Sequence, residues 1–429
     1  MSKTILSINA GSSSVKVSVY TIAPSENSQT STPELLANIQ ISGLTAPPAT
    51  LSYTRGDHKP KDQQLQNING SEDAYQKILD TLIQDDGLPN LSNPNDVNLA
   101  CHRIVHGGDY SAPVRLDRST YHHIAALSAL APLHNAGALA IVQAVHHASP
   151  QATNWAFFDT AFHASIPAAS RTYAIDPSIA ARNKLRKYGF HGLSYAFITK
   201  AVAAHLAKPP HATNIIALHL GSGASVAAIR RGRSLDTSMG LTPLSGLPGA
   251  TRSGDVDPSL IFHFTNHAGD LAPQATAEMH LTTAEQILNK ESGWKAVAGT
   301  TDFGAVSRRA GEGDEGCRLA FEVVVDRIVG YVGAYFVKMG GEVDALVFAG
   351  GIGEKGVELR RRVVEAVGCL GFGVDRGKNG GAGEREGKVV DIGVEGQGKR
   401  VLVCRTDEQE EMAVQCAEIV RGEKERVER

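Results

Sequence analysis

The chain has 429 residues, of which 42% are apolar and 20% charged, and its formal net charge is −3. This composition is typical of a globular protein with a large core, and the length allows two or three domains. The net charge shows no basic excess, so the sequence does not indicate a nucleic-acid-binding protein. The five cysteines are scattered, odd in number and without C-x-x-C spacing, which argues against a zinc site and favours free thiols in a reducing compartment.

The first predicted element is a β-hairpin over residues 5–20. Two apolar runs flank Gly11 and three serines, with Asn9 before them and Lys16 after them. Small residues at such a position form either an ordinary turn or a loop whose backbone can approach a charged group. Residues 24–72 are polar and rich in turn formers, so we expect short strands that extend the hairpin and surface loops between them.

Helical periodicity and apolar, strand-like runs alternate along the rest of the chain, which indicates α/β layering. The long apolar stretch 317–339 contains five charged residues, so it predicts a largely buried helix and not a membrane span. The N-terminus does not have the residue series of a signal peptide, and we therefore expect a cytoplasmic protein. Helices are also predicted over 72–83, 122–148 (interrupted at Pro132) and 192–207, strands over 154–162 and 214–221, and a glycine-rich loop over 376–388.

A second hairpin resembles the first. About 210 residues further on, an apolar strand again runs into small residues, starting at Gly221, and leaves as another strand. Aligning Gly11 with Gly221 superposes both flanking strands, with one extra residue in the second loop. This repeat predicts a duplicated domain, and a cleft between two related domains is a preferred ligand site.

A third glycine-rich stretch supports a competing class of enzyme. A strand leads into this stretch, a helix is predicted from near Val357, and Gly351, Gly353 and Gly356 match the pattern G-x-G-x-x-G, with Asp375 about 20 residues on. These features are typical of an NAD-dependent oxidoreductase. Fewer than 80 residues follow, however, which is too few for the remaining strands of a dinucleotide-binding domain. Glycines at a helix N-terminus equally let backbone N–H groups meet a phosphate or a nucleotide.

Charged side chains in apolar or glycine-rich surroundings are candidate site residues. Arg103 lies in an apolar strand and Arg252 among small residues, and each is either part of a structural ion pair or a ligand for carboxylate or phosphate. Asp159 and Glu408 follow apolar strands, and two carboxylates facing phosphate-binding loops suit magnesium. His191 lies in a glycine-flanked turn, where it either begins a helix or takes part in catalysis.

Ten short motifs occur in the order found in acetate kinases and run from residue 4 to about 415. They are INAGSSSVK, HRIVHGG, APLHNAG, FFDTAFH, YGFHGLS, HLGSGAS, DTSMGLTPLSG, TRSGDVDP, GGIGE and RTDE. The chain therefore resembles the acetate kinase family, which belongs to the superfold of actin, sugar kinases and heat-shock ATPases. The resemblance implies an α/β fold of two related actin-like domains, each a duplicated mixed sheet flanked by helices, with an interdomain cleft.

The resemblance also implies a domain division and a reaction. Residues 1–160 with about 409–429 form the first domain, with the phosphate loop and the acetate side, and residues 161–408 form the second, which binds the nucleotide and dimerises. The reaction is reversible, direct in-line phosphoryl transfer from ATP to acetate, giving acetyl phosphate and ADP. It requires Mg²⁺, for which Mn²⁺ can substitute, and the expected enzyme is a cytoplasmic homodimer that binds neither nucleic acid nor membranes.

The family's functional residues fall on matching positions of this chain. Catalysis is assigned to Arg103, Asp159, His191 and Arg252, of which the two arginines hold the acetate carboxylate and the migrating phosphoryl group. We expect both arginines to lie outside the core, so that replacing either leaves the fold intact. The acetate site comprises Arg103, Val105, Leu133, His134, Phe190, Pro243 and Arg252; the nucleotide and phosphate site comprises Asn9, Ser12, Ser14, Lys16, His219, Gly221, Ser222, Gly223, Asp302, Phe303, Gly351, Ile352 and Gly353; magnesium is assigned to Asn9, Glu408 and Asp159.

Three residues depart from the family pattern, and all lie on the nucleotide side. Ser222 replaces an asparagine, Gly304 an arginine that packs on the adenine, and Lys355 an asparagine. These departures leave a pyrophosphate-using acetate kinase as an alternative, beside a propionate or other short-chain carboxylate kinase. The intact glycine turn at Gly351 leaves room for adenosine and favours ATP.

Overall fold

The structure of the protein is a computed structural model that describes residues 2–427 apart from 12, 24–31, 45–47, 128–131, 265–266, 274 and 276–280, with residues 132–134 and 423–427 described as helix only. The chain divides into two compact units. Unit 1 comprises Met1–Ala161 together with Asp407–Arg429, and unit 2 comprises Phe162–Thr406.

Unit 1 is built on a mixed sheet. Its strands are β1 (Lys3–Ala10), β2 (Ser14–Ile22), β3 (Glu34–Ser42), β4 (Ala49–Thr54), β5 (Gln63–Leu65), β6 (Val97–Ile104), β7 (Val114–Arg115) and β8 (Thr153–Phe158). Among the described residues they lie in the order β5-β4-β3-β2-β1-β6-β8-β7. The strands from β5 to β1 are antiparallel neighbours, whereas β1 with β6 and β6 with β8 are parallel.

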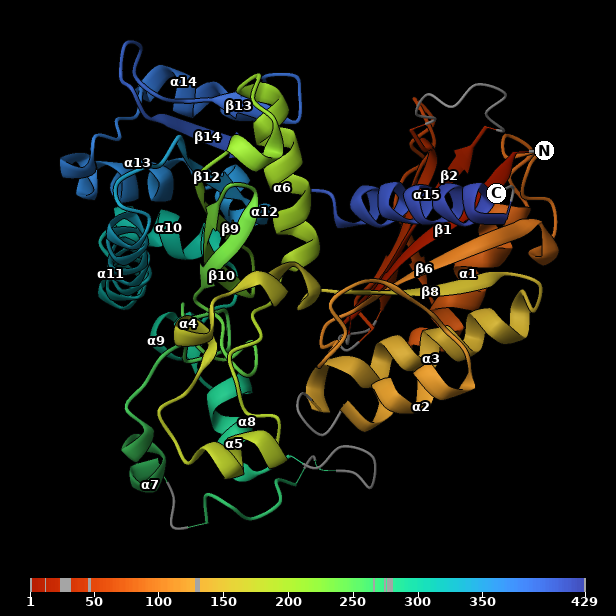
Figure 1. The fold of residues 1–429 in the computed structure, drawn as a ribbon, viewed down its shortest axis with the longest axis horizontal. Helices are drawn as coiled ribbons and strands as arrows, with labels where there is room; N and C mark the ends of the chain where they lie inside the picture. The colour runs from red at the N-terminus through yellow and green to blue at the C-terminus, as the bar shows by residue number, and fades with distance from the viewer. Residues whose placement is uncertain are drawn as a thin grey trace. The chain divides into compact units, whose positions relative to one another are not determined.

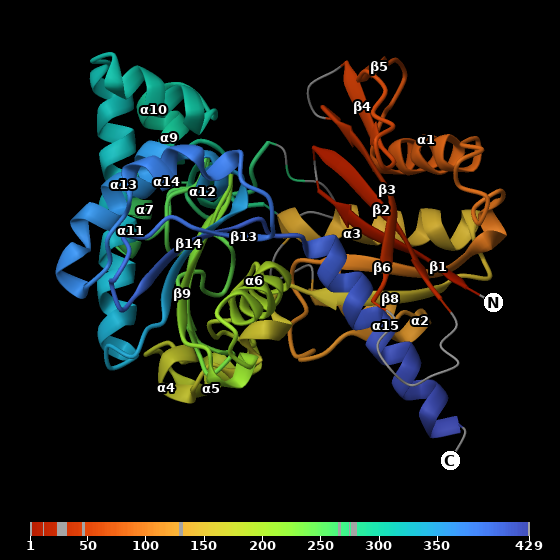
Figure 2. The same ribbon diagram turned by 90° about the horizontal axis from the view of Figure 1, so that it is seen from above.

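Helices cover both faces of this sheet (Figures 1 and 2). The helices α1 (Ser71–Ile83) and α3 (Pro132–Ala148) pack on the face that carries Leu6 and Ile8, and α2 (Arg118–Leu127) lies beside α3. On the other face, Ser7 Oγ donates to the carbonyl of Gln409, at 2.8 Å, in helix α15 (Glu408–Val427). Because side chains alternate along a strand, neighbouring residues of β1 serve different layers.

Unit 2 contains a second mixed sheet. Its strands are β9 (Ile215–Leu220), β10 (Ala224–Arg230), β11 (Arg233–Thr237), β12 (Ala345–Ala349), β13 (Val389–Asp391) and β14 (Arg400–Cys404). In the described part of the unit they lie in the order β11-β10-β9-β12-β14-β13. The helices are α4 (Ala168–Arg171), α5 (Pro177–Arg182), α6 (Gly192–His205), α7 (Ile261–Phe264), α8 (Thr283–Lys290), α9 (Gly293–Ala298), α10 (Phe303–Gly311), α11 (Glu315–Lys338), α12 (Gly350–Lys355), α13 (Val357–Ala366) and α14 (Arg376–Gly380).

Two hydrophobic clusters hold the second sheet between its helices. Alternate residues of β9 point to opposite faces, so that Ile216 and Leu218 pack against α11 and α13, while Ile215 and Ala217 pack against α6. Figures 1 and 2 both show α6 and α11 on opposite faces of this sheet. Helix α11 is present as predicted, but it is not largely buried: one face packs on the sheet, and the rest carries its charged residues together with the exposed Leu319 and Val337.

The two sheets repeat one topology, which confirms the predicted duplication. In each unit three antiparallel strands, β3-β2-β1 and β11-β10-β9, continue into two parallel strands, β6-β8 and β12-β14. The prediction that the second turn is longer is wrong. The first hairpin closes with the pair Ala10–Val15 and the second with Leu220–Ala224, so the second turn is one residue shorter.

The helices and strands expected from periodicity are present, with three corrections. The strand expected over 154–162 ends at Phe158, and Ala161–Ser165 form a short 3-10 helix. Residues 376–388 do not form only a loop, because the Asp375 carboxylate accepts a hydrogen bond from the N–H of Lys378 and begins α14. The helix expected near Val357 begins there, but the preceding glycine stretch is itself the short helix α12. No helix in the described residues has the length and apolarity needed to cross a bilayer.

Candidate active site

A buried arginine organises the candidate site of unit 1. The Arg103 guanidinium, on β6, donates to both carboxylate oxygens of Asp159, at 3.1 and 2.7 Å. Its Nη1 also lies 2.9 Å from Glu408 Oε2 and 3.3 Å from Asn9 Oδ1. Asn9 Nδ2 donates to the same Glu408 oxygen at 3.0 Å. Four predicted site residues from β1, β6, the end of β8 and the start of α15 therefore form one network.

The ion pair at the centre of this network belongs to the core of unit 1. The Asp159 side chain is 1% exposed and that of Arg103 is 17% exposed. Burial alone would lower the pKa of Arg103, but the charges of Asp159 and Glu408 raise it above its ordinary value. Removing one partner of a buried pair leaves an uncompensated charge. The expectation that Arg103 lies outside the core is therefore wrong.

The oxygen atoms around Arg103 are of the kind that magnesium prefers. Asp159 and Glu408 offer two carboxylates and Asn9 an amide carbonyl. Magnesium binds one or two carboxylates and completes its octahedron with phosphate oxygens and water. Over the residues that the structure describes, no group of three or more His, Cys, Asp and Glu side chains is arranged to hold a metal ion. The donor set fits a magnesium ion that arrives with a phosphate.

The first small-residue turn lies at the edge of the same network. Asn9 pairs with Lys16 across the β1–β2 hairpin, and the Gly11 N–H donates to the carbonyl of Ser14 at 2.9 Å. Three of the predicted phosphate-loop residues thus share one hairpin. Ser12, the fourth, lies outside the described residues.

The candidate site of unit 2 contains two stacked histidines. His191 precedes α6 with a left-handed φ of 60°, and its ring lies 4.1 Å, centre to centre, from that of His219. The Nδ1 atom of His191 is 2.8 Å from Ser225 Oγ, and the Nδ1 atom of His219 is 2.7 Å from Ser194 Oγ. A left-handed φ is uncommon outside glycine and tends to occur at functional sites.

Gly223 leaves the space in which Arg252 and His191 meet. A Cβ atom at Gly223, in the β9–β10 turn, would lie 2.9 Å from Arg252 Nη1 and 3.8 Å from His191 Nε2. Arg252 is half-buried, and this burial lowers its pKa. The second turn therefore places a guanidinium and an imidazole nitrogen at one point.

A pocket of about 600 Å³ is lined by Ser222 of the β9–β10 turn and by residues of α10, α12 and α13. All three positions that depart from the family pattern, Ser222, Gly304 and Lys355, line it. So do four of the predicted nucleotide residues: Asp302, Phe303, Gly351 and Ile352. Sequence reasoning missed Trp294, Thr301, Ser307, Arg308 and residues 356–359 of its lining.

A buried arginine, Arg360, supports the glycine turn beside this pocket. Arg360 donates to the carbonyls of Gly353 and Glu354, at 2.8 and 2.7 Å, and to Asn379. Burial lowers its pKa to about 10. Gly350, with a φ of +74°, turns the strand directly into α12, and a Cβ atom there would meet Leu220 O at 2.7 Å. Sequence reasoning missed Arg360. The signal that could have found it is an arginine at a buried position of the helix predicted from near Val357.

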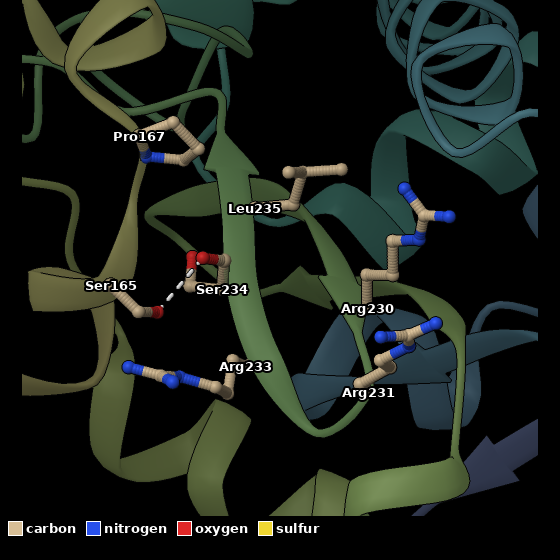
Figure 3. A pocket seen from close by; sticks show the side chains of 7 residues that line it. All are labelled: Ser165, Pro167, Arg230, Arg231, Arg233, Ser234 and Leu235. Carbon is tan, nitrogen blue, oxygen red and sulfur yellow. Dashed lines mark hydrogen bonds between the residues drawn. The ribbon is translucent and has the colours of Figure 1, made fainter.

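A second pocket, of about 430 Å³, contains three arginines from the β10–β11 hairpin and its flanks. Figure 3 shows that Arg233 points toward Ser165, away from Arg230 and Arg231. Arg230 also pairs with Glu342, at 3.2 Å. The guanidinium groups do not converge on one centre, and the pocket is not a second candidate site.

The predicted acetate residues are divided between the units. Val105 is half-buried directly after β6 of unit 1, whereas Phe190 and Pro243 are buried in unit 2. Leu133 and His134 lie in α3, but their side chains fall outside the described residues. Their grouping around a methyl group stays a prediction.

The dinucleotide-binding alternative does not fit the structure. The acidic residue that would contact a ribose, Asp375, instead caps α14 through Lys378. The glycines that matched the fingerprint form α12 and its C-terminal end.

Comparison with known proteins gives matches over nearly the whole chain. A model of the acetokinase family matches residues 4–415. A probable acetate kinase of Emericella nidulans is 52% identical over 417 residues, which cover 96% of this chain and 97% of that protein. The propionate kinase from Francisella tularensis and the acetate kinase from Porphyromonas gingivalis have similar structures, with TM-scores of 0.82 and 0.81. Each is 31% identical, and the alignments cover 96% and 97% of this chain and 98% and 100% of theirs. The chain belongs to the acetokinase family.

Proposed function

We propose that the protein is an acetate kinase, a phosphotransferase that transfers a phosphoryl group between ATP and the carboxylate of acetate. One observation carries this proposal. Each unit places an arginine at the turn of its repeated hairpin: Arg103 at the Asn9 end of β1, and Arg252 beside Gly223. Arginine is suited to both carboxylate and phosphate oxygens. We also propose that unit 1 holds the phosphate loop and the acetate side, and that unit 2 binds the nucleotide.

The nucleophile needs no general base. A simple carboxylic acid titrates near pH 4, so acetate is already ionised at neutral pH. The difficulty is electrostatic, because an anion must approach a polyphosphate. Phosphoryl transfer passes through a loose in-line transition state with charge on the equatorial oxygens. Asp159 is consequently assigned to the metal and to Arg103, and not to proton transfer.

Positive charge and hydrogen-bond donors meet this demand. Arg252 Nη1 and the Nε2 atom of His191 both lie close to Gly223, and from there they can donate to phosphoryl oxygens. Arg103 is held in a fixed orientation by Asp159 and Glu408, so that it need not reorganise during the reaction. When bound, magnesium would neutralise phosphate charge, and Asn9, Asp159 and Glu408 would hold it.

The test is trapping of acetyl phosphate as its hydroxamate in mixtures of protein, Mg²⁺, ATP and acetate. We expect hydroxamate with acetate and, since one methylene changes discrimination by about 1–3 kcal/mol, weaker formation with propionate. No product with either ATP or pyrophosphate would contradict the proposal. A higher kcat/KM for propionate would identify a propionate kinase.

The phosphoryl donor is expected to be ATP, with GTP as a stronger competitor than in relatives that have the pattern's asparagine and arginine. Ser222 and Gly304 line the pocket with less side chain to distinguish bases. Initial rates with ATP, GTP, a pyrimidine triphosphate and pyrophosphate at fixed acetate measure this preference. Exclusive use of ATP would contradict the expectation. In that case we would expect Arg308, one helical turn after Gly304 in the same pocket, to make the adenine contact.

A Gly223→Ala variant is expected to lose about 10–10²-fold in kcat. The new methyl group would lie 2.9 Å from Arg252 Nη1, so the guanidinium must move, and small misplacements of catalytic groups cost this much. Steady-state kinetics and thermal unfolding measure the effect. Gly330→Ala, in α11, is the control, because a Cβ atom there has no neighbour within 4 Å. Unchanged kcat in Gly223→Ala would place the reacting groups elsewhere.

A homodimer in the cytoplasm is also proposed. The segment 256–271 exposes several large apolar side chains, among them Phe262, with 76% of its surface exposed, and Leu271, with 61%. Apolar surface of this kind is typical of an interface. Sedimentation equilibrium is expected to give twice the chain mass, and Phe262→Asp to shift it toward the monomer. A wild-type monomer would contradict this proposal.

A further inference from the structure

A chain of three hydrogen-bonding side chains ends at the ring of His191. Tyr195, one turn further along α6, has its hydroxyl oxygen 2.6 Å from Ser225 Oγ, and Ser225 Oγ lies 2.8 Å from His191 Nδ1. Tyr195 and Ser225 are both fully buried. The large majority of buried hydroxyl groups form hydrogen bonds within the protein, and this rule gives a direction to each bond of the chain.

The direction follows from the tyrosine. Burial raises the pKa of Tyr195, so its hydroxyl keeps its hydrogen. A phenol has one hydrogen, and Ser225 Oγ is the hydrogen-bond partner that the described structure gives the Tyr195 hydroxyl. Ser225 therefore receives that hydrogen and directs its own hydrogen to His191 Nδ1. In a ring whose Nδ1 accepts, the hydrogen is on Nε2.

The backbone and the neighbouring ring hold His191 in the corresponding orientation. Its left-handed φ of 60° fixes the direction of the side chain at the start of α6, and His219 covers one face of the ring. The Nε2 atom lies on the side of Gly223 that Arg252 Nη1 also approaches, 3.8 Å from where a Cβ atom of that glycine would be.

We propose that Tyr195 and Ser225 are positioning residues that hold His191 in the tautomer with its hydrogen on Nε2, so that Nε2 donates to an oxygen of the transferring phosphoryl group. This inference rests on the proposed function for the identity of the acceptor. The other tautomer would present a lone pair to an anionic oxygen and would oppose its negative charge.

The direct test is ¹⁵N NMR of the full chain labelled with ¹⁵N-histidine, with the His191 signals assigned by their loss in His191→Gln. We expect a hydrogen on Nε2 and none on Nδ1 in the wild-type protein. This measurement needs no turnover. A hydrogen on Nδ1, or on both nitrogens at the pH of the assay, would overturn the proposal even if acetate kinase activity is found.

Variants then link the tautomer to catalysis. Tyr195→Phe and Ser225→Ala each remove one hydroxyl, and we expect both tautomers to appear and kcat to fall about tenfold, with little change in KM. This loss is smaller than the 10²–10³-fold typical of losing a donor outright. The control is Thr199→Val in the same helix, whose hydroxyl bonds the Tyr195 carbonyl at 2.7 Å and is not part of the chain to His191. If both variants keep the wild-type tautomer and kcat, as Thr199→Val should, the positioning role is excluded. If the tautomer is as expected but no hydroxamate forms with any donor, the proposed function fails and not the hydrogen-bond assignment.

Discussion

Replacing Arg252 with alanine is expected to lower kcat by about 10²–10³-fold and to leave the unfolding of the protein unchanged. Arg252 supplies positive charge beside Gly223, where His191 Nε2 also lies. Its burial lowers its pKa, which means that the folded protein holds this charge at a cost in free energy. Removing the guanidinium therefore takes away a catalytic donor together with a charge that is held at a cost in free energy.

Arg252→Ala is compared with Arg230→Ala, which removes an exposed arginine of the same unit and its surface pair with Glu342. Both variants are assayed for hydroxamate formation and for thermal unfolding. Arg230→Ala should retain activity, because Arg230 is not part of the candidate site. It should also retain stability, because a surface ion pair contributes little to the free energy of unfolding. If Arg252→Ala loses its cooperative unfolding transition while each folded molecule keeps full activity, Arg252 is part of a structural ion pair.

Local pattern was sufficient to predict the repeated part of the fold. A strand, a small-residue turn and a second strand recur at Gly11 and Gly221, and each hairpin begins a sheet of the same topology. The buried face of α1 could also be predicted, because Tyr75, Ile78, Leu79 and Leu82 follow helical spacing. These features depend on neighbours in the sequence.

The contacts that define the candidate site depend on distant segments and were predicted only in part. Asp159 and Glu408 could be singled out as carboxylates after apolar strands, but not their shared bond to Arg103, which joins three elements. In the sequence, Ser225 is one of several small residues after Gly221, and nothing there singles it out. Its contact with Tyr195 depends on how α6 packs against β10. The three departures at Ser222, Gly304 and Lys355 are separated in sequence, and only the fold brings them to one pocket.

Replacing Arg103 with alanine is expected to affect stability and activity together. The variant should lose about 10²–10³-fold in kcat, because a transition-state donor is removed. It should also destabilise unit 1 by about 3–5 kcal/mol, because Asp159, 1% exposed, loses the guanidinium that compensates its buried charge. Urea unfolding in a Trp294→Phe background isolates this effect, since the remaining tryptophan, Trp155, lies in β8 of unit 1. Arg55→Ala, whose pair with Asp85 is more exposed, is the matched control and should cost no more than about 1 kcal/mol.

The double variant Arg103→Ala/Asp159→Asn separates the two roles of the arginine. The asparagine removes the buried charge, so most of the lost stability should return. The kcat should stay low, because the guanidinium is still absent and the proposed magnesium site has also lost a carboxylate. If Arg103→Ala unfolds at the same urea concentration as its background, the ion pair does not hold unit 1 together. If the double variant instead regains activity as well as stability, Arg103 acts only by neutralising Asp159, and the positive charge for phosphoryl transfer must come from Arg252 and the metal.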